Sequence, residues 1–235
     1  MKYLKKIPQK ISGRTVVRIY RFLSVIPVPR RYTRQHALQN LQFLSQDPEW
    51  FRPGCFIENQ AEWNQVQFGC LRHHNMSHSG CEIMAVYNAM LAMGASGTAE
   101  EMTELIQYFE RAGAALLGDF GTSPAAIRKY LQKKYTVSMH CYRQGEILED
   151  LMEGQTALIT YFNDGRDLWR GIHTICATLT DGEYYLHNVY YRPKGGNYQA
   201  AGPYASLSEG FEKCFQGDAC CIICTIKVAA PSLQV

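Results

Sequence analysis

The hydrophobic pattern of this chain changes from helical to strand-like at about residue 155, and this change limits the folds that the chain can adopt. Upstream, apolar residues recur three and four positions apart, and Thr98 with Glu101 forms the signature of a helix start. Downstream, residues 157–162 form a buried-strand pattern, and Asp181-Gly182 separates two further strand patterns, which is a strong hairpin signal. Helices followed by an antiparallel sheet predict an α+β protein.

The pattern divides the chain into a lead-in segment and a main domain. The chain has 235 residues, of which 46% are hydrophobic, and this is enough to bury a substantial core. We expect a basic, irregular lead-in over residues 1–69 and the main domain over residues 70–235. Helices are expected at 14–24, 37–44, 81–93, 98–112, from 124 onward, 145–152 and 207–215, and strands at 157–162, 171–180, 183–190 and 220–228.

Positive charge is concentrated at the beginning of the sequence. The formal net charge of +3 is too small to indicate a nucleic-acid-binding protein. Ten Lys and Arg residues nevertheless lie within the first 34 positions, with apolar residues between them. This segment is either an arm that contacts an anionic or membrane surface, or a solvated face whose apolar side packs on the main body.

The nine cysteines show neither a regular disulfide spacing nor the paired pattern of a zinc site. Several lie in apolar strand runs, where cysteine behaves as a small buried hydrophobic residue. We therefore expect reduced thiols and a cytoplasmic location. The N-terminus is not a convincing signal peptide, and no uninterrupted apolar run reaches the roughly 20 residues of a membrane span.

Cys81 is the candidate nucleophile because it begins the expected helix 81–93, directly after the polar stretch 77–80. A thiol at a helix start lies near unpaired backbone N–H groups and the positive end of the helix dipole. Both favour the thiolate, which is the nucleophilic form of cysteine. Glu82 follows directly, and its negative charge would disfavour a neighbouring thiolate.

Three further residues complete a catalytic set with Cys81. His173 lies near the start of one expected strand and Asn188 at the end of its hairpin partner, so the hairpin would place positions 173–175 opposite 188–190. Histidine takes and returns a proton near neutral pH, and a third group that accepts from its other ring N–H orients it. Asn75, six residues before Cys81, is the candidate donor to the oxyanion.

The order Asn75, Cys81, His173 and Asn188 resembles papain-like cysteine peptidases, and most of all the bacterial bacteriocin-leader (double-glycine) peptidases. The resemblance covers about residues 70–228. It implies a nucleophile helix packed against an antiparallel sheet, a cleft between them, and hydrolysis of a peptide or amide bond through an acyl-thioester, without a cofactor. The family usually has Gln at the oxyanion position, where this chain offers Asn75. Aromatic residues expected near the substrate are Tyr161, Trp169, Tyr190 and Tyr191.

Two other kinds of function stay open from the sequence. The same fold and triad also serve acyltransferases and deamidases, or an inactive domain that only binds, because function depends on the site rather than the fold. A zinc site is the second alternative, since four zinc-ligand residue types lie within nine positions. These are His73, His74, His78 and Cys81.

Overall fold

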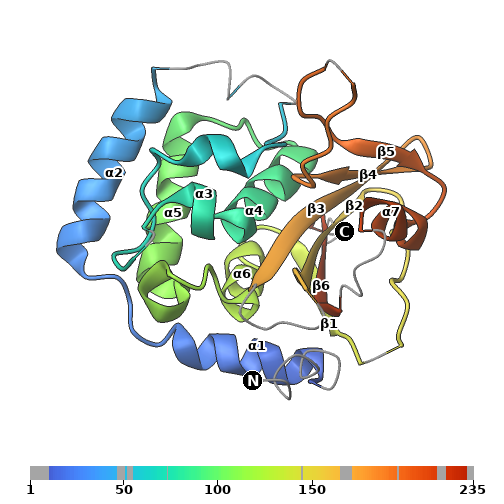
Figure 1. The fold of residues 1–235 in the computed structure, drawn as a ribbon, viewed down its shortest axis with the longest axis horizontal. Coiled ribbons are helices and arrows are strands. Elements are labelled where there is room, and N and C mark those ends of the chain that lie inside the picture. Colours follow the sequence, from blue (N-terminus) through green and yellow to red (C-terminus); the bar gives the residue numbers. More distant parts are fainter. Residues whose placement is uncertain are drawn as a thin grey trace.

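The computed structural model describes residues 11–46, 51, 55–72, 74–143, 145–164, 171–194, 196–215 and 221–231, and confirms the α+β class (Figure 1). Its helices are α1 (Gly13–Leu23), α2 (Arg30–Leu44), α3 (Met76–Ser79), α4 (Cys81–Ala92), α5 (Ala99–Ala112), α6 (Pro124–Leu131) and α7 (Leu207–Cys214), with 3₁₀ turns η4 (Gln60–Trp63) and η5 (Ala115–Gly118). Its strands are β1 (Thr136–Cys141), β2 (Gln155–Phe162), β3 (Ile172–Thr180), β4 (Glu183–His187), β5 (Ala201–Tyr204) and β6 (Ile222–Ala229).

The strands form one antiparallel sheet in the order β1-β6-β2-β3-β4-β5. The hairpin between β3 and β4 turns at Asp181-Gly182, as the sequence predicts. Both residues have positive φ, 53° and 78°, which is what a two-residue hairpin turn of type I′ requires. Cys176 pairs with His187, so the same register continued past the end of the ladder puts position 173 opposite position 190.

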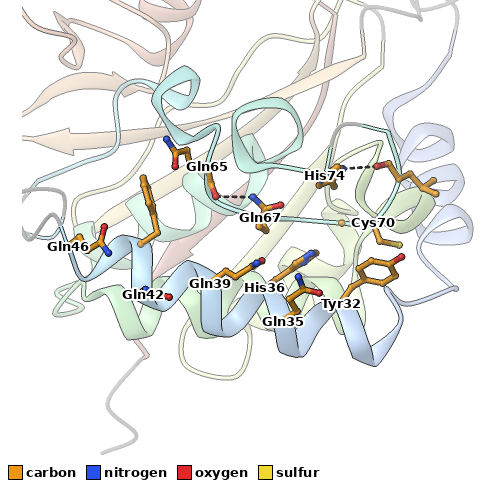
Figure 2. A pocket seen from close by; sticks show the side chains of 13 residues that line it. Tyr32, Gln35, His36, Gln39, Gln42, Gln46, Gln65, Gln67, Cys70 and His74 are labelled. Atoms are coloured by element: carbon orange, nitrogen blue, oxygen red, sulfur yellow. Dashed lines mark hydrogen bonds between the residues drawn. The ribbon is translucent and has the colours of Figure 1, made fainter.

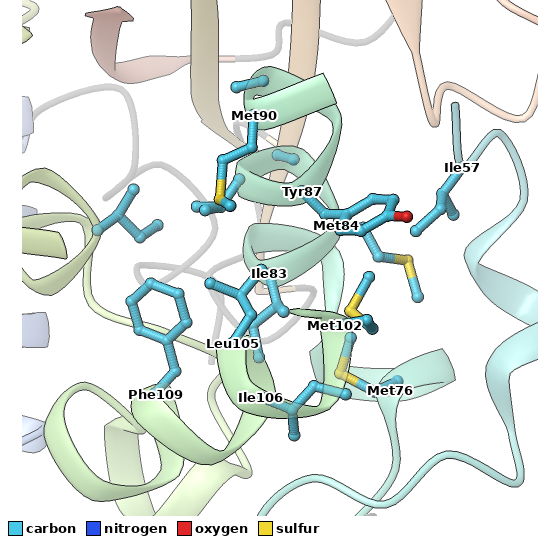
Figure 3. Packing of buried hydrophobic residues seen from close by; sticks show 14 of the residues in the cluster. Ile57, Met76, Ile83, Met84, Tyr87, Met90, Met102, Leu105, Ile106 and Phe109 are labelled. Carbon is cyan, nitrogen blue, oxygen red and sulfur yellow. The ribbon is translucent and has the colours of Figure 1, made fainter. Parts of the chain in front are cut away.

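Helix α4 lies at the centre of the molecule, between strand β3 and helix α5 (Figure 1). Its first ten residues, Cys81 to Met90, are all buried, so this helix is apolar on every side rather than amphipathic. Each large side chain buried in this way stabilises the fold by about 1.5–3 kcal/mol. The packing therefore fixes the position of Cys81 at the start of α4. Figure 3 shows the core around α4 and α5, which includes Ile83, Met84, Tyr87, Leu105, Ile106 and Phe109.

The sheet is buried on both faces, which explains the continuous apolar run in β2. Leu158 belongs to the core on the α4 side, whereas Ile159 and Tyr161 belong to a second core that is covered by α7. On that side the Tyr161 ring meets the edge of the Phe211 ring, with centroids 5.2 Å apart. The strand thus alternates between two buried faces, as its pleat requires.

The described part of the expected lead-in packs onto the same body. Helix α1 contacts β6, α6 and η5 and buries Val16 and Tyr20 there. Helix α2 packs along α5, and its His36 Nδ1 lies 2.5 Å from the Oε1 atom of the buried Glu110. No described helix is both long enough and apolar enough to cross a bilayer.

The prediction of a helix at 145–152 is wrong. Residues 145–152 are irregular, because other elements bind the backbone groups that a helix would pair within itself. Leu151 N–H donates to Tyr184 Oη (3.1 Å), and the Leu148 carbonyl accepts from Ser208 Oγ (3.2 Å). The strand expected at 183–190 is shorter, since it ends at His187, before residues with positive φ. Strands β1 and β5 were not expected from the sequence.

Candidate active site

A cavity of about 450 Å³ brings together residues from the start of α4, the ends of β2 and β3, and η4. Cys81 and His173 both line it, and Gln60, His78, Tyr161 and Tyr190 surround them. A second cavity, of about 460 Å³, shares Cys81 and His78 with the first and also includes Glu82. The fold therefore places the predicted nucleophile and the predicted base, 92 positions apart in the sequence, at one site.

The surroundings of Cys81 favour the thiol over the thiolate. Its side chain is 5% exposed, and its Sγ–H donates to Glu82 Oε2 at 3.2 Å. Burial, and then the charge of Glu82, raise the pKa of the Cys81 thiol well above its usual value, although the backbone N–H of Thr174 acts in the opposite direction. Desolvation and the adjacent carboxylate therefore oppose the thiolate that the helix start was expected to favour.

Glu82 is a buried carboxyl group in direct contact with the candidate nucleophile. It is 1% exposed, and burial raises its pKa to about 7. The Thr122 backbone N–H favours the charged form. The backbone of Gly121 approaches so closely that a Cβ there would lie 2.6 Å from Glu82 Oε2. Gly121 also has φ +72°, so both space and backbone conformation require glycine beside this carboxyl group.

The ring of His173 is oriented by a main-chain group. His173 Nε2 lies 3.1 Å from the carbonyl oxygen of Asn188, so Nε2 carries the proton and Nδ1 keeps its lone pair. The ring stacks on Tyr190 (centroids 5.9 Å apart) and meets Tyr161 edge-on (5.8 Å). Burial lowers the pKa of His173, and the Asn188 carbonyl partly offsets this effect. Among the hydrogen bonds of the described residues, none joins this ring to the Cys81 thiol.

Asn188 holds His173 through its backbone, and not through its side chain as the sequence analysis expects. The residue has φ +61°, just past the end of β4, and this change of direction presents its carbonyl oxygen to the ring. Its side-chain Oδ1 accepts from the Gln60 backbone N–H at 3.1 Å, and its own backbone N–H donates to Glu58 Oε2 at 3.0 Å. Through these hydrogen bonds, Asn188 links the β3–β4 hairpin to residues 58–60.

Gln60 is the site residue that the sequence analysis missed. It is buried, and its Nε2 donates to the carbonyl oxygens of Met76 (3.1 Å) and Ser77 (2.9 Å), both in the short helix α3 before Cys81. It thus connects Asn188 with the helix that precedes the nucleophile. No local spacing marked this residue, because its partners lie 16, 17 and 128 positions away.

Asn75, the expected oxyanion donor, does not line the cavity. Its Oδ1 accepts from the His78 backbone N–H at 3.0 Å and caps α3. Of the aromatic residues expected near a substrate, Tyr161 and Tyr190 line the cavity, whereas Tyr191 does not. Trp169 lies outside the described residues.

His187 is structural, as its position on the opposite side of the strand predicts. Its Nδ1 lies 2.6 Å from Glu58 Oε1, and its Nε2 lies 3.0 Å from Thr178 Oγ1. The ring also stacks on Phe56 with centroids 4.1 Å apart. One carboxylate, that of Glu58, therefore holds two successive residues at the end of β4.

The zinc site that the sequence left open as an alternative is not seen within the described residues. No group of three or more His, Cys, Asp or Glu side chains there is placed to hold a metal ion. His74 Nδ1 lies 2.9 Å from the Leu71 carbonyl oxygen, and His78 lines the cavity with Cys81. His73 lies outside the part of the chain that the structure describes.

A larger cavity of about 630 Å³, between α2 and residues 65–74, also contains thiol and imidazole groups (Figure 2). Its thiol is Cys70, whose pKa is raised by burial and then by Glu110. Its His36 is engaged by Glu110, and six glutamine side chains make up much of the rest of its lining. His74 Nδ1 lies 2.9 Å from the Leu71 carbonyl oxygen, and among the hydrogen bonds of the described residues none joins His36 or His74 to the Cys70 thiol.

Comparison with protein-family models, with curated proteins and with solved structures gave no match for this chain.

Proposed function

We propose that this chain is a papain-like cysteine hydrolase, which cleaves a peptide or amide bond through an acyl-thioester on Cys81. One observation carries the proposal. Cys81, at the first position of a buried helix, and His173, oriented by a main-chain carbonyl, line the same cavity. A thiol and an imidazole at one site are the parts that acyl transfer to sulfur needs.

In the proposed reaction, Cys81 Sγ attacks the substrate carbonyl carbon while its proton passes to Nδ1 of His173. A C–S bond forms and the carbonyl oxygen becomes an oxyanion. The intermediate collapses, the C–N bond breaks, and His173 returns the proton to the leaving amine. Water, deprotonated by His173, then attacks the thioester, so that a carboxylic acid leaves and the Cys81 thiol is restored.

For the oxyanion we assign Gln60 in place of Asn75, together with the Cys81 backbone N–H. Gln60 lines the cavity, whereas Asn75 caps α3. The Nε2 group of Gln60 donates to two carbonyl oxygens in the substrate-free protein, so the substrate oxygen must replace one of them. A donor of this kind contributes about 10²–10³-fold to the rate.

Glu82 keeps the Cys81 thiol protonated in the substrate-free site. Its carboxylate accepts the thiol hydrogen and raises the pKa of Cys81, so the nucleophile stays protonated until the base removes the proton. In this proposal Glu82 positions the thiol, and His173 moves the proton. The arrangement lowers the thiolate fraction of the resting site, and His173 still takes the proton when an electrophile reaches the sulfur.

An acyltransferase or deamidase would share the first half of this reaction and differ only in the acceptor or the leaving group. An inactive binding domain is the alternative that the protonated thiol favours. These alternatives make different predictions for thiol chemistry, because only the inactive domain lacks an activated Cys81.

Alkylation of the native protein by iodoacetamide near neutral pH, followed by mass spectrometry of each cysteine peptide, tests the proposal. Cys176 and Cys224 are matched controls, because both are buried and burial raises the pKa of each to about 12. We expect Cys81 to react well ahead of both, and His173→Ala to remove the difference. Equal reactivity of the three thiols would leave the inactive domain as the better description.

A further inference from the structure

Helix α1 and the segment after it expose large apolar side chains that the proposed hydrolase chemistry does not use. Phe22 is 77% exposed, Val25 70%, Ile26 67% and Ile19 46%. These residues lie within eight positions of the chain, at the end of α1 and directly after it, and we refer to them together as the apolar patch. Exposed apolar side chains gathered in this way mark an interaction surface.

Positive charges lie next to these apolar residues. Arg14, Arg18 and Arg21 belong to α1, and no ion pair involves them among the described residues. The first 46 residues contain no Asp or Glu, so nothing within this segment neutralises the charge. Further along, the start of α2 adds three more exposed arginines, Arg30, Arg31 and Arg34.

The patch has a fixed position on the molecule. The opposite side of α1 buries Val16 and Tyr20 in a cluster with Phe162 and Ile223. The Ser12 side chain caps the helix by accepting from the Thr15 backbone N–H. Helix α1 therefore lies along one edge of the molecule, anchored by its inner face (Figure 1).

We propose that the outer face of α1, with Val25 and Ile26, binds the surface of an anionic phospholipid bilayer. Exposed apolar side chains next to a row of cations match the boundary of acyl chains and negatively charged headgroups. A nucleic acid would neutralise the arginines but leave four apolar side chains in water. A second copy on the same patch would bring the arginines of both copies together.

Sedimentation of the full chain with lipid vesicles tests the proposal, and it depends on none of the catalytic residues. We expect binding to vesicles that contain phosphatidylglycerol, little binding to phosphatidylcholine alone, and release at high salt. Phe22→Ser should weaken binding about tenfold or more, as burial of a large apolar side chain predicts. Arg18→Ala should weaken it about fivefold.

Ile147→Ser and Met152→Ser are the matched controls, because these residues are 76% and 69% exposed outside α1. Both should bind vesicles like the unchanged protein, with circular dichroism confirming that all variants are folded. Equal binding to neutral vesicles, or equal losses in the control variants, would overturn the proposal. Binding to a nucleic acid but not to vesicles, or concentration-dependent self-association lost in Phe22→Ser without any vesicle binding, would overturn it as well.

Discussion

The Cys81 thiol donates a hydrogen bond of 3.2 Å to the carboxylate of Glu82, the next residue in the chain. This contact places a buried acidic group, whose pKa is raised to about 7, directly against the candidate nucleophile. The candidate base, His173, donates instead to the Asn188 carbonyl. Two groups could therefore accept the thiol proton, the Glu82 carboxylate and the His173 imidazole. In the proposed reaction it passes to the imidazole.

Glu82→Gln should make Cys81 more reactive. The substitution keeps the shape of the side chain but removes the charge that raises the pKa of the thiol. Each unit by which the thiol pKa falls increases the thiolate fraction about tenfold, so alkylation at fixed pH should become severalfold faster or more. Mass-spectrometric alkylation rates of the Cys81 peptide measure this effect.

Glu209→Gln is the control for that experiment, because Glu209 pairs with Lys213 at the surface on α7. It should leave the Cys81 rate unchanged. Slower alkylation in Glu82→Gln would show instead that Glu82 is the group that removes the thiol proton, and the role of His173 would have to be reassigned.

The same substitution should change how stability depends on pH. The pKa of Glu82 is raised to about 7 in the folded protein from its ordinary value of 4.5, so the folded state binds more protons between these values. Stability from this group is present in full below about pH 4.5 and is lost as the pH rises toward 7, a change of about 3 kcal/mol.

Urea unfolding of both proteins across this pH range is the measurement. The difference in unfolding free energy, Glu82→Gln minus unchanged protein, should increase as the pH rises from about 4.5 to about 7. A difference that is constant with pH would mean that Glu82 ionises in the folded protein as it does in water.

Asn188→Gly and Asn188→Ala should separate the backbone of this residue from its side chain. Both remove the acceptor for the Gln60 N–H, and a buried N–H group left without a partner costs about 1–3 kcal/mol. Alanine also meets a cost of about 1 kcal/mol at φ +61°, which glycine avoids. The alanine variant should therefore be the less stable of the two in urea unfolding.

Both Asn188 variants keep the main-chain carbonyl that His173 uses. We expect the His173 titration, followed by NMR of the imidazole, to stay close to that of the unchanged protein. A large change in the His173 pKa in the glycine variant would indicate that the side chain orients the ring after all.

Gln60→Ala should mainly lower the catalytic rate, whereas Asn75→Ala should mainly lower stability. If Gln60 binds the oxyanion, Gln60→Ala should lower kcat on a peptide or ester substrate about 10²–10³-fold. Asn75→Ala should leave kcat nearly unchanged and lower stability by about 0.5–2 kcal/mol, because it removes the cap of α3. A loss of kcat in Asn75→Ala alone would restore the role that the sequence analysis gave to Asn75.

Local signals predicted the elements that local interactions form. The capping box of Thr98 and Glu101 is present at the start of α5, and Asp181-Gly182 makes the turn that its residue types predict. Cys81 begins α4 as expected. In each case the information lies within a few residues, so one sequence is sufficient.

The parts that were missed depend on contacts between distant residues. Gln60 and Glu58 bind Asn188 across 128 and 130 positions, and no periodicity records such pairs. The apolar spacing at 145–152 suggested a helix, but contacts with Tyr184 and α7 determine the conformation there. The thiol pKa was also misjudged, because burial of Cys81 is a property of the whole fold.

Trapping of an acyl-enzyme tests the central claim most directly. The protein is mixed with nitrophenyl acetate, and the acetylated cysteine peptides are identified by mass spectrometry while nitrophenolate release is followed. We predict a burst of about one equivalent with the acetyl group on Cys81, absent in Cys81→Ala and strongly slowed in His173→Ala. Acetylation of Cys81 no faster than that of Cys176, or insensitive to His173→Ala, would contradict the account.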